Sequence, residues 1–196
     1  MESIISKLCE LLIQQEVIQE VDREVYEYSF SVLILNSVYY LICFVLMLYY
    51  QTFLLPILFT TIFLLLRSYM GGWHANTMWG CMLLGLLLFT TAVNIMIYPD
   101  ITGQGKLVFS GFVMLLTGWS VYHFGIQDHK NRPLSSLEKI AAQKKCYKLL
   151  LILSVLMIGA ALLHQIDVTF CVGLACFAAT ILLLLAKTKK EGKDET

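Results

Sequence analysis

Six long apolar runs constrain this chain more than any other feature of its sequence. They cover residues 29–50, 52–66, 82–98, 107–126, 149–166 and 168–186. Each is about the length of helix that crosses a bilayer core of roughly 30 Å. With 58% hydrophobic residues and a mean hydropathy of +0.74, the chain is also more apolar than one soluble core requires. We therefore predict an all-α, polytopic membrane protein with six transmembrane helices.

The second run is the least regular of the six, because it is short and contains Pro56, so it could be tilted, kinked or extended by its flanks. The predicted organisation is an amphipathic interfacial helix at 1–28, lying on the membrane or against the bundle, a six-helix domain at 29–186 and a charged tail at 187–196. The acidic amino terminus does not resemble a cleaved signal peptide.

Basic residues divide unevenly between the two sides of these six spans. Lys106 alone falls on one side. The other side holds Lys7, Arg23, Arg67, Lys130, Arg132, Lys139, Lys144, Lys145, Lys148, Lys187, Lys189, Lys190 and Lys193. Because basic residues are retained in the cytoplasm, both termini and the loops at 67–81 and 127–148 are expected there. The net charge of zero gives no reason to expect nucleic-acid binding.

Small and polar residues within the spans predict where helices pack. Gly85, Gly111, Gly118, Gly159 and Gly173 offer close helix contacts. Asn36 and Asn94 are expected to hydrogen-bond between helices rather than to bind substrate.

The segment from Arg67 to Cys81 gathers the glycines and polar residues that its flanking helices lack. Cys81 falls where the third span begins, so the unpaired N–H groups of a helix end could stabilise a thiolate there. His74 precedes it by seven positions. A thiolate and an imidazole are sufficient for covalent acyl transfer, since sulfur attacks a carbonyl and histidine moves the protons.

This spacing imposes a condition on the chain between His74 and Cys81. On one uninterrupted helix the two residues would share a face but lie about 10 Å apart along the axis, beyond hydrogen-bond reach. We therefore predict a bend or turn between them, which Gly71, Gly72 and Gly80 would make easier. His123 and His129 are alternative partners for the thiol, whereas His164 should lie on the opposite side of the membrane.

The other five cysteines lie mostly in or beside apolar runs and form no CxxC pair, which argues against a disulfide framework and a thiolate metal site. We expect no metal or other cofactor. A lone histidine or cysteine at a membrane interface is more often a packing residue than a catalytic one, so the pair alone is a modest signal.

At this segment the chain resembles the accessory gene regulator protein B (AgrB) family, membrane peptidases that process quorum-sensing pro-peptides. The resemblance extends over essentially the whole chain and rests on Arg67, Gly72, His74 and Cys81 at the family's spacing, with a later segment at 130–134. It implies a multi-pass protein of the bacterial cell membrane. It also implies that Cys81 is the nucleophile and His74 the general base of a cysteine endopeptidase.

The implied substrate is a short, AgrD-like pro-peptide, whose acyl-enzyme is then captured by a thiol or hydroxyl of the peptide to give a cyclic thiolactone or lactone. Members of the family also act as homodimers. Arg67 could clamp a carboxylate or the oxyanion, or simply anchor its helix; Gly72 would serve backbone geometry, and Asn76 or Thr77 could orient the imidazole. The basic residues at 139–148 could hold an acidic peptide or anchor the chain in the membrane.

Two other classes of function compete with a peptidase. Six helices could export a small peptide without chemistry, although the spans lack the acidic residues of proton- or cation-coupled transporters. A haem or redox protein would need His123 and His164 as ligands, and their expected placement on opposite sides of the membrane disfavours this.

Overall fold

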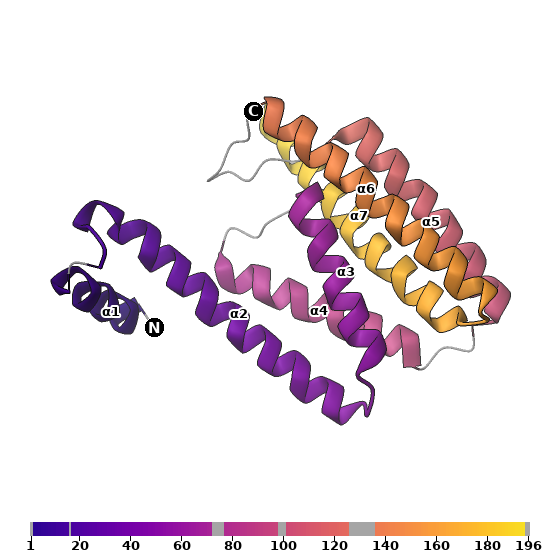
Figure 1. The fold of residues 1–196 in the computed structure, drawn as a ribbon, viewed down its shortest axis with the longest axis horizontal. Coiled ribbons are helices and arrows are strands. Elements are labelled where there is room, and N and C mark those ends of the chain that lie inside the picture. Colours follow the sequence, from indigo (N-terminus) through magenta and orange to yellow (C-terminus); the bar gives the residue numbers. More distant parts are fainter. Residues whose placement is uncertain (1, 16, 72–76, 98–100, 126–135, 195–196) are drawn as a thin grey trace. The chain divides into compact units, whose positions relative to one another are not determined.

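The computed structural model describes residues 2–15, 17–71, 77–97, 101–125 and 136–194. Every regular element within these ranges is a helix (Figure 1). In chain order they are α1 (Glu2–Gln14), the 3-10 helix η1 (Glu20–Asp22), α2 (Arg23–Tyr49), α3 (Leu54–Met70), α4 (Met78–Ile97), α5 (Gly103–Phe124), α6 (Ser136–Leu162) and α7 (Ile166–Asp194). The all-α prediction is confirmed.

Each of the six apolar runs falls mostly within a different helix, although the fifth run, 149–166, continues past the end of α6 at Leu162 to the first residue of α7. The helices are not equivalent as membrane spans. Helices α2, α4, α5, α6 and α7 contain segments long and apolar enough to cross a bilayer. Helix α3 has 17 residues, or about 26 Å of rise, and is shorter than the usual span. Pro56 lies in its first turn, where a missing N–H costs no helical hydrogen bond. Within the described ranges there are therefore five candidate spans and one shorter apolar helix.

The chain divides into two compact units, Met1–Tyr49 with Ala75–Leu86, and Tyr50–His74 with Leu87–Thr196. In the first unit, the segment predicted as one helix up to residue 28 is divided, because α1 ends at Gln14 and α2 begins at Arg23. Helix α1 packs on α2 and buries Ile5 and Cys9. Apolar contact with a neighbouring helix thus holds this short segment in place.

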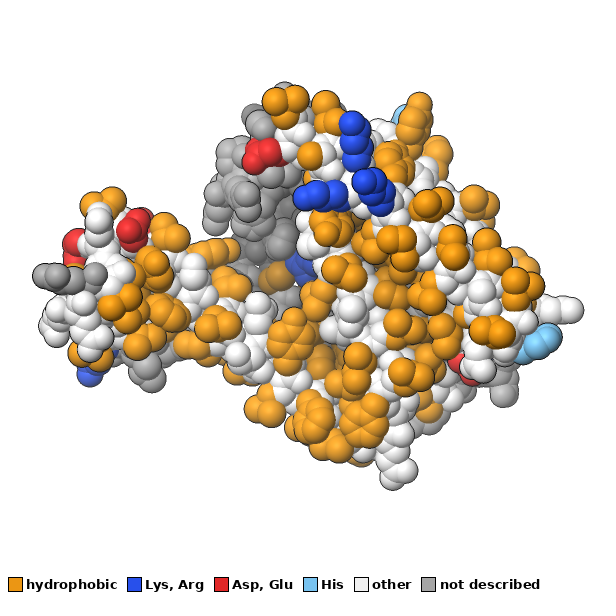
Figure 2. Space-filling model, in the orientation of Figure 1, with side chains coloured by type: hydrophobic (Ala, Val, Ile, Leu, Met, Phe, Trp, Pro, Cys, Tyr) orange, Lys and Arg blue, Asp and Glu red, His pale blue; other side chains and the backbone are white. Residues whose placement is uncertain are grey.

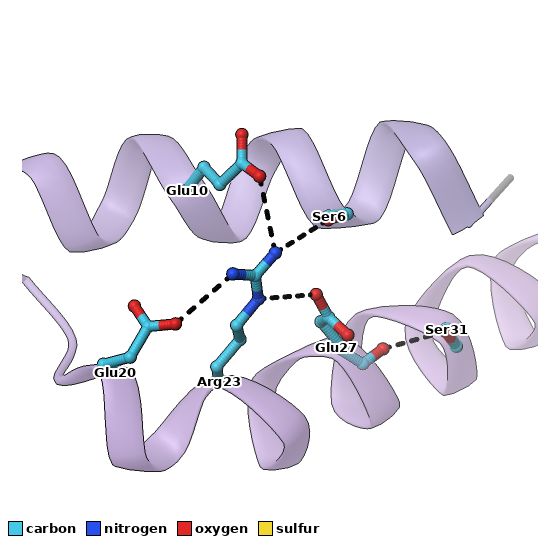
Figure 3. Close-up of polar contacts among 6 residues, drawn as sticks. All are labelled: Ser6, Glu10, Glu20, Arg23, Glu27 and Ser31. Carbon is cyan, nitrogen blue, oxygen red and sulfur yellow. Dashed lines mark hydrogen bonds and ion pairs between the residues drawn. The ribbon is translucent and has the colours of Figure 1, made fainter.

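Arg23 joins α1 to the start of α2 (Figure 3). Its guanidinium donates to Ser6 at 2.9 Å and to Glu10 at 3.4 Å on α1. On its own side it also donates to Glu20 at 3.3 Å and to Glu27 at 3.1 Å. One planar guanidinium can serve several acceptors because it carries five N–H donors in a fixed arrangement.

Helix α7 lies at the centre of the second unit, with α3, α5 and α6 around it (Figure 1). Of its span, 72% is buried. Helices α5 and α7 run parallel, as three contacts along their length show: each joins residues at corresponding positions of the two helices. The ion pair Lys106–Asp167 (2.7 Å) joins their first turns, Thr117 and Thr180 meet at 2.8 Å in the middle, and the Lys187 Nζ lies 4.2 Å from the Phe124 ring near the end of α5.

Helices α3 and α6 are both packed on this parallel pair. The Cys171 thiol on α7 contacts the Leu55 carbonyl oxygen at 3.2 Å, near the beginning of α3. Gln143, early in α6, contacts the carbonyl oxygen of Val121, late in α5, at 3.4 Å, so α6 runs antiparallel to α5. A tight turn follows α6, in which His164 has a φ of 57° and its N–H donates to Ala161 O. That geometry gives His164 a structural role in the turn.

The five glycines that the sequence marks as helix contacts behave differently. A Cβ on Gly173 would lie 2.9 Å from the Ser110 Cα, and one on Gly85 would lie 3.3 Å from the Tyr39 ring. By contrast, a Cβ on Gly111, Gly118 or Gly159 would meet nothing within 4 Å. The close-contact prediction is confirmed for Gly85 and Gly173 only.

Apolar side chains also cover much of the surface seen in Figure 2. On α5, for example, Val108, Phe112 and Leu115 are all more than 60% exposed. Such a surface is expected of helices whose outer faces contact lipid rather than water. Together with the five long apolar helices, it describes a multi-pass membrane protein.

Candidate functional site

The segment predicted as a site is bounded by the end of α3 and the beginning of α4. Helix α3 ends when the Gly71 N–H donates to Arg67 O at 3.0 Å. Gly71 has a φ of 71°, a left-handed conformation that glycine adopts without steric cost. Arg67 lies in the last turn of α3 and is half-buried, at the end of a helix where a cation is favoured.

Thr77 caps the beginning of α4. Its hydroxyl oxygen accepts a hydrogen bond from the Gly80 N–H at 3.1 Å, and its carbonyl oxygen accepts one from the Cys81 N–H at 3.2 Å. Threonine is favoured at this position because its side chain satisfies an N–H group that lacks a helical partner. The described contacts therefore give Thr77 a role in starting the helix that carries the thiol.

Cys81 lies one turn into α4, so its thiol is near the positive end of the helix. Side chains on a helix lean towards its N-terminus, which directs this thiol back towards the segment that precedes α4. Cys81 is also partly exposed, and Trp79 in the same turn of α4 is 52% exposed. A thiol in this position is accessible from outside the helix, as a reactive cysteine must be.

The other five cysteines differ from Cys81 in one respect that matters for reactivity. All six lie in the described part of the chain and all are thiols, but only Cys81 is not buried. Cys9, for instance, is fully covered by the α1–α2 contact, and this burial raises the pKa of its thiol, with Glu27 adding to the effect. Buried structural thiols are chemically inert in general.

Three of the predicted site residues, Gly72, His74 and Asn76, lie outside the described residues. The bend predicted between His74 and Cys81 therefore stays a prediction, although α4 itself begins only at Met78. Arg67 belongs to the second compact unit and Cys81 to the first, and each unit is described by itself.

The alternative histidines have other contacts or lie elsewhere. His123, in the last turn of α5, stacks on Trp119 with ring centroids 5.2 Å apart. His164 forms the turn after α6, and His129 lies outside the described residues. Asn94, as predicted, hydrogen-bonds beyond its own helix, donating to the Tyr50 hydroxyl at 3.0 Å, whereas Asn36 is exposed on α2.

Sequence reasoning missed a residue close to the thiol. Tyr39 on α2 packs against Gly85, which follows Cys81 by one helical turn. A glycine in an apolar helix is the signal for a close neighbour, but the sequence does not say which residue that neighbour is.

An α-helical, multi-pass membrane protein with an accessible thiol at a helix end is the class that these features define. The sequence model of the family described as Accessory gene regulator B matches residues 5–184, and the chain therefore belongs to this family. Neither the curated proteins nor the solved structures contain a significant match.

Proposed function

We propose that the protein is a membrane-embedded cysteine endopeptidase that cleaves a short quorum-sensing pro-peptide and promotes its cyclisation. Membership of the Accessory gene regulator B family supports a role in peptide processing. The observation that carries the chemical part is the position of Cys81, the one cysteine of six that is partly exposed, one turn into a capped helix.

In the first step the Cys81 thiolate attacks the carbonyl carbon at the carboxyl side of the signal region. A C–S bond forms, the peptide C–N bond breaks, and the imidazolium of His74 gives its proton to the departing amine. The products are a thioester on Cys81 and the released carboxy-terminal piece. His74 obtained that proton from the thiol, so the step is balanced.

In the second step a thiol or hydroxyl within the acylated peptide attacks the same carbonyl. A new thioester or ester closes the ring, the bond to Cys81 breaks, and the proton from the attacking group returns to the Cys81 sulfur through His74. Exchange of one thioester for another is nearly balanced in free energy, so exclusion of water is what favours the ring over hydrolysis. The membrane interface supplies that exclusion.

The other residues of the segment support this chemistry. In this proposal Arg67 neutralises a substrate carboxylate or the oxyanion, and Gly72 allows the substrate backbone a close approach. Thr77 starts the helix of the nucleophile, and Asn76 or Thr77 orients the imidazole. The site faces the cytoplasm of a bacterial cell, where a thiol stays reduced, and the protein works as a homodimer in the bilayer.

The test is to coexpress the protein with a candidate pro-peptide and to compare variants at matched membrane abundance. Cys81→Ala and His74→Ala should both abolish cleavage, whereas Cys146→Ala, which removes a buried thiol, should retain it. Cleavage that survives in both site variants would rule out this site. Uncleaved peptide that accumulates outside the cell would instead identify an exporter.

A further inference from the structure

In the unit that contains Cys81, α2 and α4 approach each other closely where Tyr39 faces Gly85. A Cβ built on Gly85 would lie 3.3 Å from Cε2 of the Tyr39 ring, with two further ring atoms at 3.9 Å. Both residues are buried. The ring therefore fills the space that any larger residue at position 85 would need.

This contact lies on the face of α4 that carries the thiol. Cys81 and Gly85 are four positions apart in one helix, so they share a face, with their β positions about 6 Å apart. Tyr39 is consequently the neighbour of α4 one turn further along the helix than Cys81. Any movement of α4 away from Tyr39 would move the thiol as well.

The Tyr39 ring has little room to give way. It is packed edge-on against Tyr40, with ring centroids 5.4 Å apart, and Cys43 follows one helical turn later on the same buried face of α2. Leu35, Tyr39 and Cys43, spaced four apart, are the buried residues of α2, and neighbours such as Leu41 and Phe44 are at least half exposed. The face of α2 through Tyr39 thus carries the residues of this helix that are buried.

We propose that Tyr39 and Gly85 form a positioning pair, which sets where the first turns of α4 lie against α2 and thereby where the Cys81 sulfur meets its substrate. This inference rests on the proposed function, because it assigns the pair a role in the reaction of Cys81. Covalent attack needs the reacting atoms in near-contact and aligned, so a small displacement of the nucleophile slows chemistry more than it weakens binding.

The test substitutes Gly85→Ala, with Gly118→Ala as the matched control, since a Cβ at position 118 meets nothing within 4 Å. A third variant combines Gly85→Ala with Tyr39→Leu, which removes the ring atoms that the new methyl group would contact. For each variant, kcat and KM are measured for cleavage of the pro-peptide. The rate at which iodoacetamide alkylates Cys81 is measured in parallel by peptide mass spectrometry.

Gly85→Ala should lower kcat about tenfold while KM changes less than about twofold. The Tyr39→Leu change should restore most of that loss, and Gly118→Ala should match the wild type. The proposal is overturned if Gly85→Ala retains the kcat of the wild type, or if the amount of folded protein falls while kcat per folded molecule does not. It is also overturned if the double variant has no higher kcat than Gly85→Ala.

The alkylation measurement separates this inference from the proposed function. If wild-type protein fails to cleave the pro-peptide, the peptidase proposal fails, yet the pair still predicts that Gly85→Ala alters alkylation of Cys81 and that Tyr39→Leu reverses the change. Equal alkylation of Cys81 in all three proteins would overturn the pair on its own.

Discussion

Helices α7 and α2 are both long and apolar, but the structure uses them differently. Of the α7 span 72% is buried, compared with 17% of the α2 span. Helix α7 is surrounded by other helices and has small residues and hydroxyls where it meets α5, whereas α2 presents most of its surface outwards. Hydropathy alone cannot separate a scaffold helix from a helix left open to lipid or partners.

From this contrast we infer that the α5–α7 pair contributes most to the stability of the protein, and that the unit containing α1, α2 and Cys81 opens locally more easily. Local opening is least costly where few buried contacts must be broken. The proposed reaction needs a peptide to reach Cys81, so the more open unit is the suitable one to contain the nucleophile.

The largest effect on stability should come from Gly173→Ala on α7. The new methyl group would lie 2.9 Å from the Ser110 Cα, and backbone cannot rotate away as a flexible side chain can. Overpacking of this kind costs about 2 kcal/mol, which lowers the melting temperature by about 5 °C. Thermal unfolding of the detergent-solubilised protein measures it. Gly111→Ala is the control, because its new methyl group would meet nothing within 4 Å, and its melting temperature should not fall below that of the wild type. Equal melting temperatures of the two variants would show that a close contact at Gly173 makes no difference to stability.

An intermediate effect is expected at the junction of α1 with α2. Arg23→Ala removes the contacts to Ser6 and Glu10, so α1 should separate more often and expose Cys9. Because burial is the largest cause of the raised pKa of that thiol, exposure should increase its alkylation at pH 8 several-fold.

Lys7→Ala is the charge-matched control for this variant, since Lys7 is exposed on the same helix. Arg23 itself lowers the pKa of the Cys9 thiol, so its loss without undocking would make Cys9 react more slowly. A slower rate in Arg23→Ala would therefore show that α1 stays in place without its arginine.

The smallest effect should be that of Thr117→Val within the α5–α7 pair. The Thr117 and Thr180 hydroxyls contact each other, and each also lies within hydrogen-bond distance of a carbonyl oxygen of its own helix. The two hydroxyls have only two protons for these three contacts. One hydroxyl therefore donates to the other helix, and the other donates to the carbonyl oxygen of its own helix. Hydrogen bonds between membrane helices contribute about 0.6 kcal/mol on average, or a melting shift of about 2 °C. If Thr180→Val lowers the melting temperature as much in the Thr117→Val background as in the wild type, the two hydroxyls are not coupled.

The sequence predicts the helices well because apolar periodicity and length are local properties. Each of the six apolar runs falls mostly within a different helix, although the run at 149–166 also includes the turn after α6, and the sequence marks Cys81 as a residue near a helix start. It does not predict that α1 ends at Gln14, because the apolar spacing continues past a break that only packing determines. Nor does the sequence predict that Gly173 is in close contact with a neighbouring helix and Gly159 is not. That difference depends on which residue of another helix lies opposite each glycine, and the register between helices is a long-range property.

The central claim is that the Cys81 sulfur forms a covalent bond with the peptide. The most direct measurement is to mix membranes containing the protein with pro-peptide, quench with acid and determine the mass of the fragment that carries Cys81. The account predicts an added mass equal to the acylated signal region, released by neutral hydroxylamine and absent in Cys81→Ala. Cleavage that proceeds in Cys81→Ala, or an adduct on any other residue, would contradict it.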